Sequence, residues 1–396
     1  MKIVQFGLCF SPNLGDGIIA ECIAYGLTSR RPDASVTCID ISARQSRGAV
    51  PIGNRELILA ILDRLPRPLR HTLALWKLNR VIDGVEPAWS KAAQADLAVI
   101  GGGQIFADAN LNFPIKLARA ARVLKAAGTP TAIYGVGVAA NWSRRGKALF
   151  GAVFATDLHM IGVRDEGSAQ AWRAQTTGGP SPEITYDPGL LAAQCYGEPP
   201  APPRGIGLCI TDFALLAHHA DDTIAGQSAG GVAFYTSIVT SLIDRGHQVT
   251  LFSNGASEDT ALMAALAKAP ALREAIESNH LRIPPAASTP RDLAMQIAGF
   301  QAVIAHRLHA CIVAYSYGRP VIGMGWDKKL ESFFDLAAQG AFFSADPAIR
   351  GDDIAQLVDA AIAAGVDPAH HKAVVDGAWD GIDRLLAVAT RAPVSG

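Results

Sequence analysis

The side chains best suited to acid–base and anion chemistry gather in residues 299–334. Arg307 and His309 stand two positions apart, and Lys328 and Lys329 come further along the same stretch. Arginine offers a planar fork to an oxyanion, and histidine can hold or release a proton near neutral pH. The set suits a phosphate or carboxylate ligand, although Arg-x-His alone also fits a structural arginine beside a helix-capping histidine.

The pattern around these side chains predicts a βαβ unit that positions them. A short apolar run at Gln301–Ala305 precedes a helical period at Arg307–Tyr317, and a second run at Val321–Met324 precedes a helix that opens at Asp327. Ligands of parallel sheets bind at the carboxyl ends of the strands, where the helix N-termini also favour anions. The basic residues, His306 included, fall at these ends.

A glycine-rich loop follows the first predicted strand, Lys2–Cys9. Gly15 and Gly17 would let this loop approach a ligand closely, and Asn13 or Asp16 can cap the helix that follows. The same pattern also occurs where a loop simply caps a helix. The sequence contains no G-x-G-x-x-G and no P-loop motif, so it predicts neither a dinucleotide site nor an ATP site.

Three consecutive glycines, Gly101, Gly102 and Gly103, follow the predicted strand Asp96–Ile100. At the end of a strand they would leave backbone N–H groups bare, and such groups can receive an oxyanion. Tight packing or a strained turn is the alternative interpretation.

Charged residues end two further predicted strands. Arg164 follows His159–Val163, and Asp187 follows Ile184–Tyr186. At a strand end that faces a cleft between domains, Arg164 can clamp a carboxylate. The alternative is a surface ion pair with Asp165.

The length and composition predict a two-domain protein that binds small anions. Single hydrophobic cores seldom grow beyond ~250–300 residues, and this chain has 396 residues, 49% of them hydrophobic. The net charge of −1 argues against a protein that wraps nucleic acid. The local cations therefore suit a small ligand better than a polymer.

The cysteines and the N-terminus favour a cytoplasmic protein. The six cysteines are scattered without a metal-ligand pattern, which predicts free thiols in a reducing compartment. The opening MKIVQFGLCFSPN is typical of a first strand, not of a signal peptide. No run reaches the ~18–20 apolar residues that a membrane helix needs, which leaves peripheral contact with a membrane open.

A proline-rich segment, CYGEPPAPPR, divides the chain. We expect a Rossmann-like domain at 1–195, a semi-rigid linker at 196–204 and a second Rossmann-like domain at 205–396. The last helix, near His370–Ala389, can cross back to the first domain. Residues 44–90 carry basic residues between Leu and Trp, which predicts either a surface for an anionic or lipid-linked substrate or an ordinary solvated helix face.

Taken in order, these segments resemble the polysaccharide pyruvyl transferases over roughly residues 3–340. The likeness lies in NLGDGIIAECIAYGL, GGG (101–103), VRDEGS (163–168), TYDPGL (185–190) and RLHACIVAYSYGRPVIGMGWDKKLESFF (307–334). The resemblance implies an α/β fold of two facing Rossmann-like domains, similar to GT-B glycosyltransferases. It also implies that phosphoenolpyruvate supplies a pyruvate ketal to two sugar hydroxyls with release of phosphate.

The resemblance also assigns roles to individual residues. Arg164, His309 and Lys329 match the phosphoenolpyruvate-binding positions, and Arg307 lies in the same motif as a further phosphate or carboxylate contact. A positioned histidine is the commonest general acid, so we expect His309 to protonate the donor, Lys329 and Arg307 to hold its phosphate, and Arg164 its carboxylate. The base that activates the sugar is expected among three acids, namely Asp16, Asp165 and Asp187.

The expected partners are phosphoenolpyruvate as co-substrate and a sugar or lipid-linked oligosaccharide as acceptor, with no metal and no other cofactor. Trp326 departs from the family, in which tyrosine is more common before Asp-x-Lys. We expect a location in the cytoplasm or at the inner face of the membrane. Two alternatives stay open: a GT-B glycosyltransferase that uses a nucleotide sugar, and a non-catalytic relative that binds glycans.

Overall fold

The described part of the chain folds into two six-stranded sheets in which every strand pair is parallel. A computed structural model describes residues 1–47, 67–108, 110–177, 180–213, 231–325 and 328–390, with the backbone alone at 67–74. Helices alternate with the strands along the chain. The predicted α/β class with parallel sheets is confirmed.

The chain divides into two compact units, each described by itself below. Unit 1 contains Met1–Pro12, Ile23–Tyr186 and Asp380–Gly396, and unit 2 contains Asn13–Cys22 and Asp187–Trp379. Neither unit is therefore one continuous segment. The predicted first domain ended at 195, whereas residues 187–195 belong to unit 2 together with the proline-rich segment.

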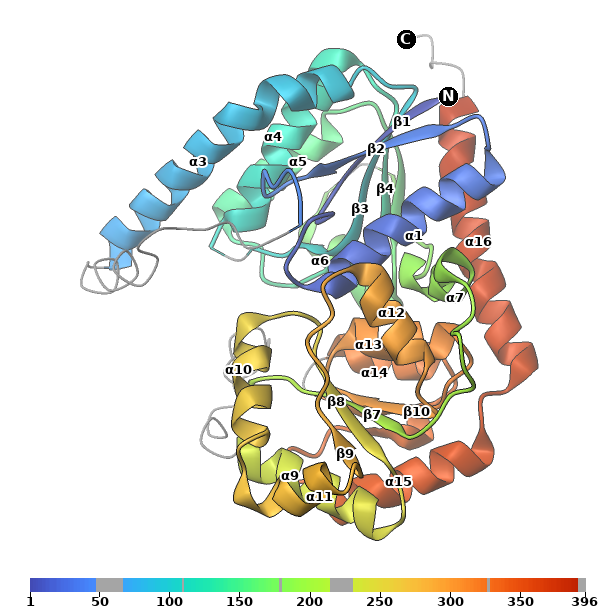
Figure 1. Cartoon of the computed structure of the whole chain (residues 1–396). Helices are drawn as coiled ribbons and strands as arrows, with labels where there is room; N and C mark the ends of the chain where they lie inside the picture. Colours follow the sequence, from blue (N-terminus) through green and yellow to red (C-terminus); the bar gives the residue numbers. More distant parts are fainter. Residues whose placement is uncertain (48–66, 109, 178–179, 214–230, 326–327, 391–396) are drawn as a thin grey trace. The chain divides into compact units, whose positions relative to one another are not determined.

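Unit 1 has the strand order β2-β1-β3-β4-β5-β6. Its helices α3, α4 and α5 lie on one face of the sheet, and the C-terminal part of α16 lies on the other (Figure 1). Every residue of β4 is buried, as expected for a parallel strand covered on both faces. The strands are β1 (Lys2–Gly7), β2 (Ser35–Asp40), β3 (Leu97–Phe106), β4 (Thr131–Val138), β5 (Leu158–Val163) and β6 (Glu183–Ile184). The helices assigned to this unit in whole or in part are α1 (Leu14–Arg30), α3 (Arg67–Ala92), α4 (Asn112–Ala127), α5 (Arg144–Phe154), α6 (Glu166–Gln175) and α16 (Pro368–Thr390).

An aromatic cluster forms part of the core between the unit 1 sheet and its helices. The ring of Phe106 lies 5.2 Å from Phe150 and 5.1 Å from Trp172, measured between centroids. Trp142 completes the cluster and donates its indole N–H to the Phe106 carbonyl at 2.8 Å. A buried tryptophan needs such a partner.

The three glycines at 101–103 correct one prediction. Strand β3 does not end at Ile100 but continues to Phe106, so the glycines lie inside it. Gly101 and Gly103 pair with β4, and both Gly102 and Gly103 have positive φ, at 80° and 73°. The register shifts after Gly103, and a conformation that only glycine adopts readily makes this irregularity. The triplet therefore bends a strand and does not present a bare strand end.

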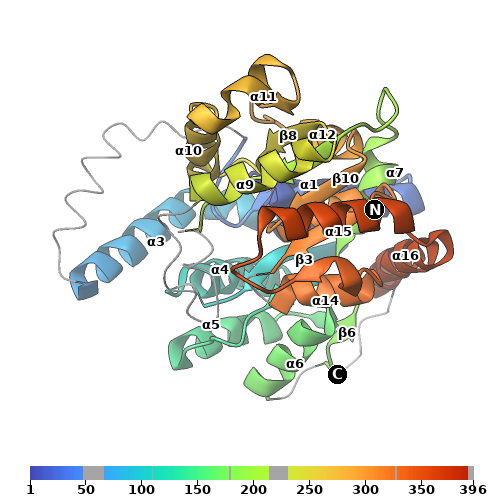
Figure 2. The ribbon, with the colours of Figure 1, turned by 90° about the horizontal axis from the view of Figure 1, so that it is seen from below.

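Unit 2 has the strand order β12-β11-β10-β7-β8-β9. Helices α10 and α15 pack beside α9 on one face, where Tyr235, Leu242 and Val358 join the core (Figure 2). The strands are β7 (Ile206–Cys209), β8 (Val249–Phe252), β9 (Leu281–Arg282), β10 (Ala302–Ala305), β11 (Val321–Met324) and β12 (Phe343–Ser344). The helices are η1 (Pro188–Leu191), α7 (Ala192–Tyr196), α9 (Gly231–Asp244), α10 (Ser257–Leu266), η2 (Pro270–Leu272), α11 (Arg273–Glu277), α12 (Pro290–Ala298), α13 (Leu308–Ser316), α14 (Lys328–Leu336), η3 (Gly340–Phe342) and α15 (Gly351–Ala364).

Local sequence signals explain where the unit 2 helices begin. Thr289 caps α12, its side chain accepts from the Asp292 N–H at 3.1 Å, and the Asp292 carboxylate accepts from the Thr289 N–H at 3.0 Å. Proline stands at the first helical position, where no N–H is needed. This capping box places α12 directly before β10, which carries the predicted site.

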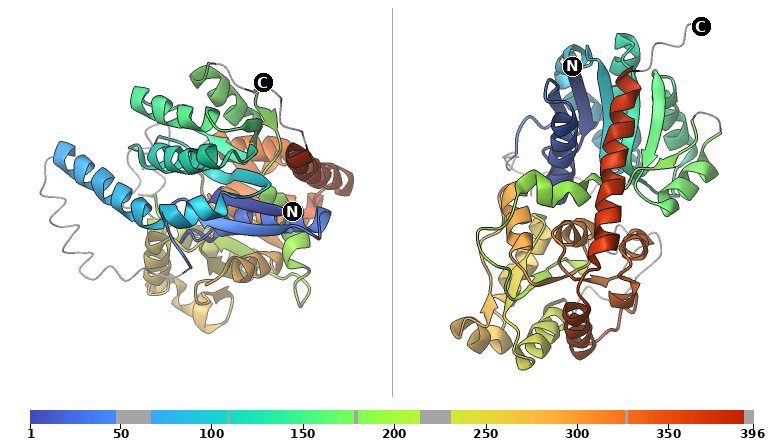
Figure 3. Two further views of the ribbon diagram at one scale, coloured as in Figure 1. Left: turned by 90° about the horizontal axis from the view of Figure 1, so that it is seen from above. Right: turned by 90° about the vertical axis from the view of Figure 1, so that its right-hand side faces the viewer.

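The final helix, α16, belongs to both units. It runs without a break from Pro368 to Thr390, and its residues from Asp380 onward belong to unit 1 (Figure 3). Arg384 anchors this end by donating to the Glu183 carboxylate at 2.7 Å and to the Ile184 carbonyl at 2.9 Å.

Candidate functional site

The turn between β10 and α13 carries the residues of the central motif. His306 is buried at the end of β10, and its Nδ1 lies 2.7 Å from the Met324 carbonyl of β11. Burial lowers the pKa of His306 to about 4, so the ring is neutral at pH 7. The sequence counted His306 among the cations of the site, and this is corrected: His306 joins two strand ends.

Arg307 is held by a carboxylate that the sequence did not indicate. Its Nη2 donates to Asp259 Oδ2 at 2.7 Å, and the Asp259 side chain is fully buried. Asp259 also accepts from the Asp212 N–H at 2.8 Å. Burial raises the pKa of Asp259, while the guanidinium opposes that shift. Asp259 thus fixes the fork of Arg307 and balances its charge.

His309 lies in the first turn of α13 with its ring between two neighbours from other parts of unit 2. A methyl group built on Gly15 would lie 2.8 Å from both Cβ and Nδ1 of His309, so only glycine fits there. On the other side, His309 Nε2 lies 3.8 Å from Asp187 Oδ2. That distance is an ion-pair contact and exceeds a hydrogen bond. The predicted close approach of Gly15 is therefore to a side chain of the site.

Asp187 and the loop before α1 are themselves held in place. Asp187 Oδ1 accepts from the Gly189 N–H at 2.9 Å and so caps η1, which leaves Oδ2 on the side of His309. The Leu14 N–H donates to the Asn254 carbonyl at 2.8 Å, and the Gly15 N–H lies 3.3 Å from Asn13 Oδ1. Both neighbours of His309, the loop at Gly15 and the side chain of Asp187, are thus held by hydrogen bonds from backbone N–H groups.

Asp16 and Lys329 occupy the first turns of two helices in unit 2. Asp16 is half-buried in the first turn of α1, directly after Gly15. Lys329 is half-buried in the first turn of α14, whereas its neighbour Lys328 is exposed. The predicted contributions of residues 326 and 327 lie outside the described residues.

Arg164 stands at the end of β5 in unit 1. The residue is 4% exposed, and its Nε donates to Asp165 Oδ2 at 3.1 Å. The other oxygen of Asp165 accepts from the Ser168 N–H at 2.6 Å and caps α6. A methyl group on Gly137 would lie 2.7 Å from Arg164 Nη2. Within the described part of the chain, Nη2 is buried without a hydrogen-bond partner, so its N–H can donate to an oxyanion.

Helix α3 carries an exposed aromatic side chain among cations. Trp76 is 58% exposed and Val81 is 45% exposed. The guanidinium of Arg80 lies 5.0 Å from the centre of the Trp76 ring, and Lys77 is exposed beside it. Figure 3 shows that the N-terminal half of α3 extends beyond α4. None of the helices that the structure describes is both long enough and apolar enough to span a membrane.

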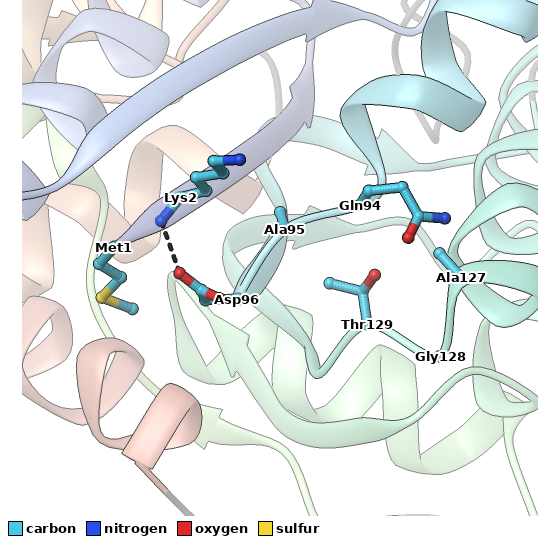
Figure 4. Close-up of a pocket in the computed structure, with 8 residues that line it drawn as sticks. All are labelled: Met1, Lys2, Gln94, Ala95, Asp96, Ala127, Gly128 and Thr129. Carbon is cyan, nitrogen blue, oxygen red and sulfur yellow. Dashed lines mark hydrogen bonds between the residues drawn. The ribbon is translucent and has the colours of Figure 1, made fainter.

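A pocket at the opposite edge of the unit 1 sheet does not belong to this chemistry (Figure 4). It lies at the starts of β1 and β3, where the Lys2 N–H donates to Asp96 Oδ2 at 2.7 Å. None of the predicted site residues lines it. Its lining is Met1, Lys2, Gln94, Ala95, Asp96, Ala127, Gly128 and Thr129.

A comparison with protein families decides what this chain is. The sequence profile described as polysaccharide pyruvyl transferase matches residues 13–328. The chain belongs to the polysaccharide pyruvyl transferase family. It is therefore a transferase, and the family's description implies a sugar or polysaccharide acceptor. Among curated proteins, none matches the sequence.

Solved structures share the fold of this family member but little of its sequence. A UDP-glucosyltransferase from Polygonum tinctorium has a TM-score of 0.53 at 10% identity, covering 99% of each chain. A UDP-N-acetylglucosamine 2-epimerase from Rickettsia bellii also has a TM-score of 0.53 at 10% identity, covering 98% of this chain and 96% of its own. The likeness to the glucosyltransferase supports the GT-B-like Rossmann fold.

Proposed function

We propose that this transferase moves the enolpyruvyl group of phosphoenolpyruvate onto two hydroxyls of a sugar, as a ketal, in a surface polysaccharide or its lipid-linked precursor. In the balanced reaction, the donor methylene becomes a methyl group and phosphate leaves. The two sugar hydroxyls together lose two protons. The methyl group gains the equivalent of one, and the phosphate carries the other. The observation that carries the proposal is the placement of His309 between Gly15 and Asp187 in a member of this family.

His309 is the general acid of the proposed reaction. Protonation of the methylene carbon develops positive charge at C2, which a sugar oxygen then attacks. A carboxylate beside an imidazole favours its charged form, and Asp187 Oδ2 lies 3.8 Å from Nε2. Asp187 therefore positions the ring for this role.

Three cations are proposed to hold the donor. Lys329 and Arg307 bind its phosphate and stabilise the charge that develops as it leaves. The ion pair with Asp259 keeps the Arg307 fork in one orientation. Arg164 is proposed to bind the carboxylate, to which its buried Nη2 can donate.

Asp16 is the base that we propose for the sugar hydroxyl. Asp165 already uses one oxygen to cap α6 and the other for Arg164. Asp187 caps η1 and lies beside His309. We choose Asp16 for its position, because it is half-buried and directly follows the glycine that lies against His309.

We also propose that α3 meets the membrane that carries a lipid-linked acceptor. Trp76 combines an exposed apolar body with nearby cations, a combination that favours the headgroup region of an anionic bilayer. This contact would be peripheral.

Turnover and binding test the proposed function. Phosphate release should require both phosphoenolpyruvate and lipid-linked or polymeric glycan from the producing cell, and His309→Ala should lower it ~10²–10⁴-fold. Lys329→Ala should weaken phosphoenolpyruvate binding in calorimetry, while the matched variant Lys328→Ala binds normally. Turnover of UDP or GDP sugars without phosphoenolpyruvate would refute the proposal, as would full activity in His309→Ala.

A further inference from the structure

Unit 1 contains a buried cation that the proposed reaction does not use. Lys116 lies in the second turn of α4 with 6% of its surface exposed. Its Nζ donates to Ser42 Oγ at 2.9 Å and lies 5.3 Å from the ring centre of Phe113. Among the described residues, this is the only hydrogen bond of the ammonium. Burial of an ammonium is costly unless it is paired, and a hydroxyl and a ring compensate it in part.

Among the residues that the structure describes, the charges that act on Lys116 leave an excess of positive charge. Asp40, at the end of β2, is buried and already accepts from the Phe10 N–H at 2.8 Å and the Ser42 N–H at 2.7 Å. Arg44 Nη1 lies 3.8 Å from the same carboxylate. Burial and the like charge of Arg44 lower the pKa of Lys116 to about 8, against the opposing effect of Asp40. Two cations thus share one carboxylate whose oxygens are both occupied.

The cations lie where a sheet of this order binds ligands. Ser42 follows β2, and Lys116 belongs to the helix after β3, so their contact links the two strands that flank β1. The order of the strands reverses between β1 and β3, and the crevice at that point is the usual ligand site of such sheets. Ala43, between Ser42 and Arg44, has a φ of 61°. A left-handed alanine costs ~1–2 kcal/mol, so the backbone of this turn is held in an unfavourable but defined conformation.

We propose that Lys116, Ser42 and Arg44 form an oxyanion-binding site that takes a phosphate or carboxylate group of the sugar acceptor. An oxyanion would accept the remaining N–H bonds of Lys116 and the fork of Arg44, and charge-assisted bonds of this kind are the strong ones. The anion site is inferred from the geometry of unit 1 alone, whereas the inference that it binds the acceptor rests on the proposed function. Acceptors of this class can carry their negative charge as a diphosphate linker or as a uronate.

Calorimetry with the full chain tests the site. Inorganic pyrophosphate and glucuronate represent the two sources of charge, and glucose is the neutral control. Lys116→Met should weaken binding of the preferred anion ~10–100-fold, the range for loss of a hydrogen bond to a charged group. Lys125→Met, which removes an exposed lysine of the same helix, should bind as the wild type. No binding of either anion by the wild type, or equal affinity in Lys116→Met, would overturn the proposal.

A second measurement does not depend on the folding of that variant. Saturating pyrophosphate or glucuronate, whichever binds, should protect Lys116 of the wild type from acetylation, followed by peptide mass spectrometry. Ser42→Ala should weaken the same anion about 3–10-fold, since it removes a neutral hydroxyl. Acetylation of Lys116 at an undiminished rate would overturn the proposal.

Phosphoenolpyruvate separates this proposal from the proposed function. Its affinity should be unchanged in Lys116→Met, and an equal loss for phosphoenolpyruvate and pyrophosphate would overturn the assignment to the acceptor. If the wild type binds pyrophosphate at Lys116 but no phosphoenolpyruvate, the proposed function fails while the anion site stands.

Discussion

Gly15→Ala is the substitution that tests the geometry around His309 most directly. The added methyl group would lie 2.8 Å from His309 Cβ and Nδ1, whereas nonbonded carbon atoms prefer ~3.5–4.0 Å. The ring or the loop must therefore move by about 1 Å. A misplacement of ~1 Å in catalytic geometry can lower turnover ~10²-fold. We expect kcat for phosphate release to fall by about that factor.

The Gly15→Ala protein should stay folded, because native domains are commonly stable by ~5–15 kcal/mol. Overpacking costs ~1–3 kcal/mol, but alanine in place of glycine in a helix recovers up to ~1 kcal/mol. The free energy of unfolding should thus fall by no more than about 3 kcal/mol, measured by denaturant titration. Gly151→Ala is the matched control, because it lies within α5 and its added methyl group would meet no atom within 4 Å. A folded Gly15→Ala protein with wild-type kcat would refute the role assigned to the ring.

Three further predictions concern other contacts. Asp187→Asn should lower turnover at least ~10-fold, because it removes the carboxylate that lies 3.8 Å from His309 Nε2 and positions the ring. Wild-type turnover would exclude that role. Asp259→Asn leaves Arg307 without its counter-charge and should lower the free energy of unfolding by about 2–3 kcal/mol. This is less than the ~3–5 kcal/mol of a fully buried pair, because the arginine side chain is 18% exposed. A loss below ~0.5 kcal/mol in denaturant titration would contradict this prediction. Trp76→Ala should reduce co-sedimentation of the protein with vesicles that contain phosphatidylglycerol, whereas the control Lys91→Ala on the same helix should not. Equal sedimentation of the two variants would refute the proposed contact of α3 with the membrane.

The sequence predicted the supersecondary structure of the central motif well. The apolar runs at Gln301–Ala305 and Val321–Met324 correspond to β10 and β11, because a parallel strand buried on both faces leaves a continuous apolar signal. The end of a strand followed by a helix then fixes where Arg307 and His309 stand. Local patterns were sufficient for this part of the site.

The partners of these residues could not be predicted, because each depends on contacts between distant segments. Asp259 lies inside the first turn of a helix, where an acidic residue ordinarily serves the helix dipole, and nothing in its neighbourhood marks it as the partner of Arg307. The approach of Gly15 to His309 joins segments nearly three hundred positions apart. The prediction of a strand end at Gly101–Gly103 was wrong, because a run of glycines is typical of the end of a strand. Here the run lies within β3 and bends it.

The division of α1 and α16 between the two units has a consequence for synthesis on the ribosome. Residues 13–22 emerge before the rest of unit 2, and their packing partners in that unit begin only at Asp187. Unit 1 in turn awaits the stretch from Asp380 onward. Domains commonly fold as units while the chain is still growing, but here neither can complete its contacts early. Nascent chains should stay protease-sensitive until the last helix has left the exit tunnel, and a fragment cut at the proline-rich segment would leave the neighbour of His309 behind.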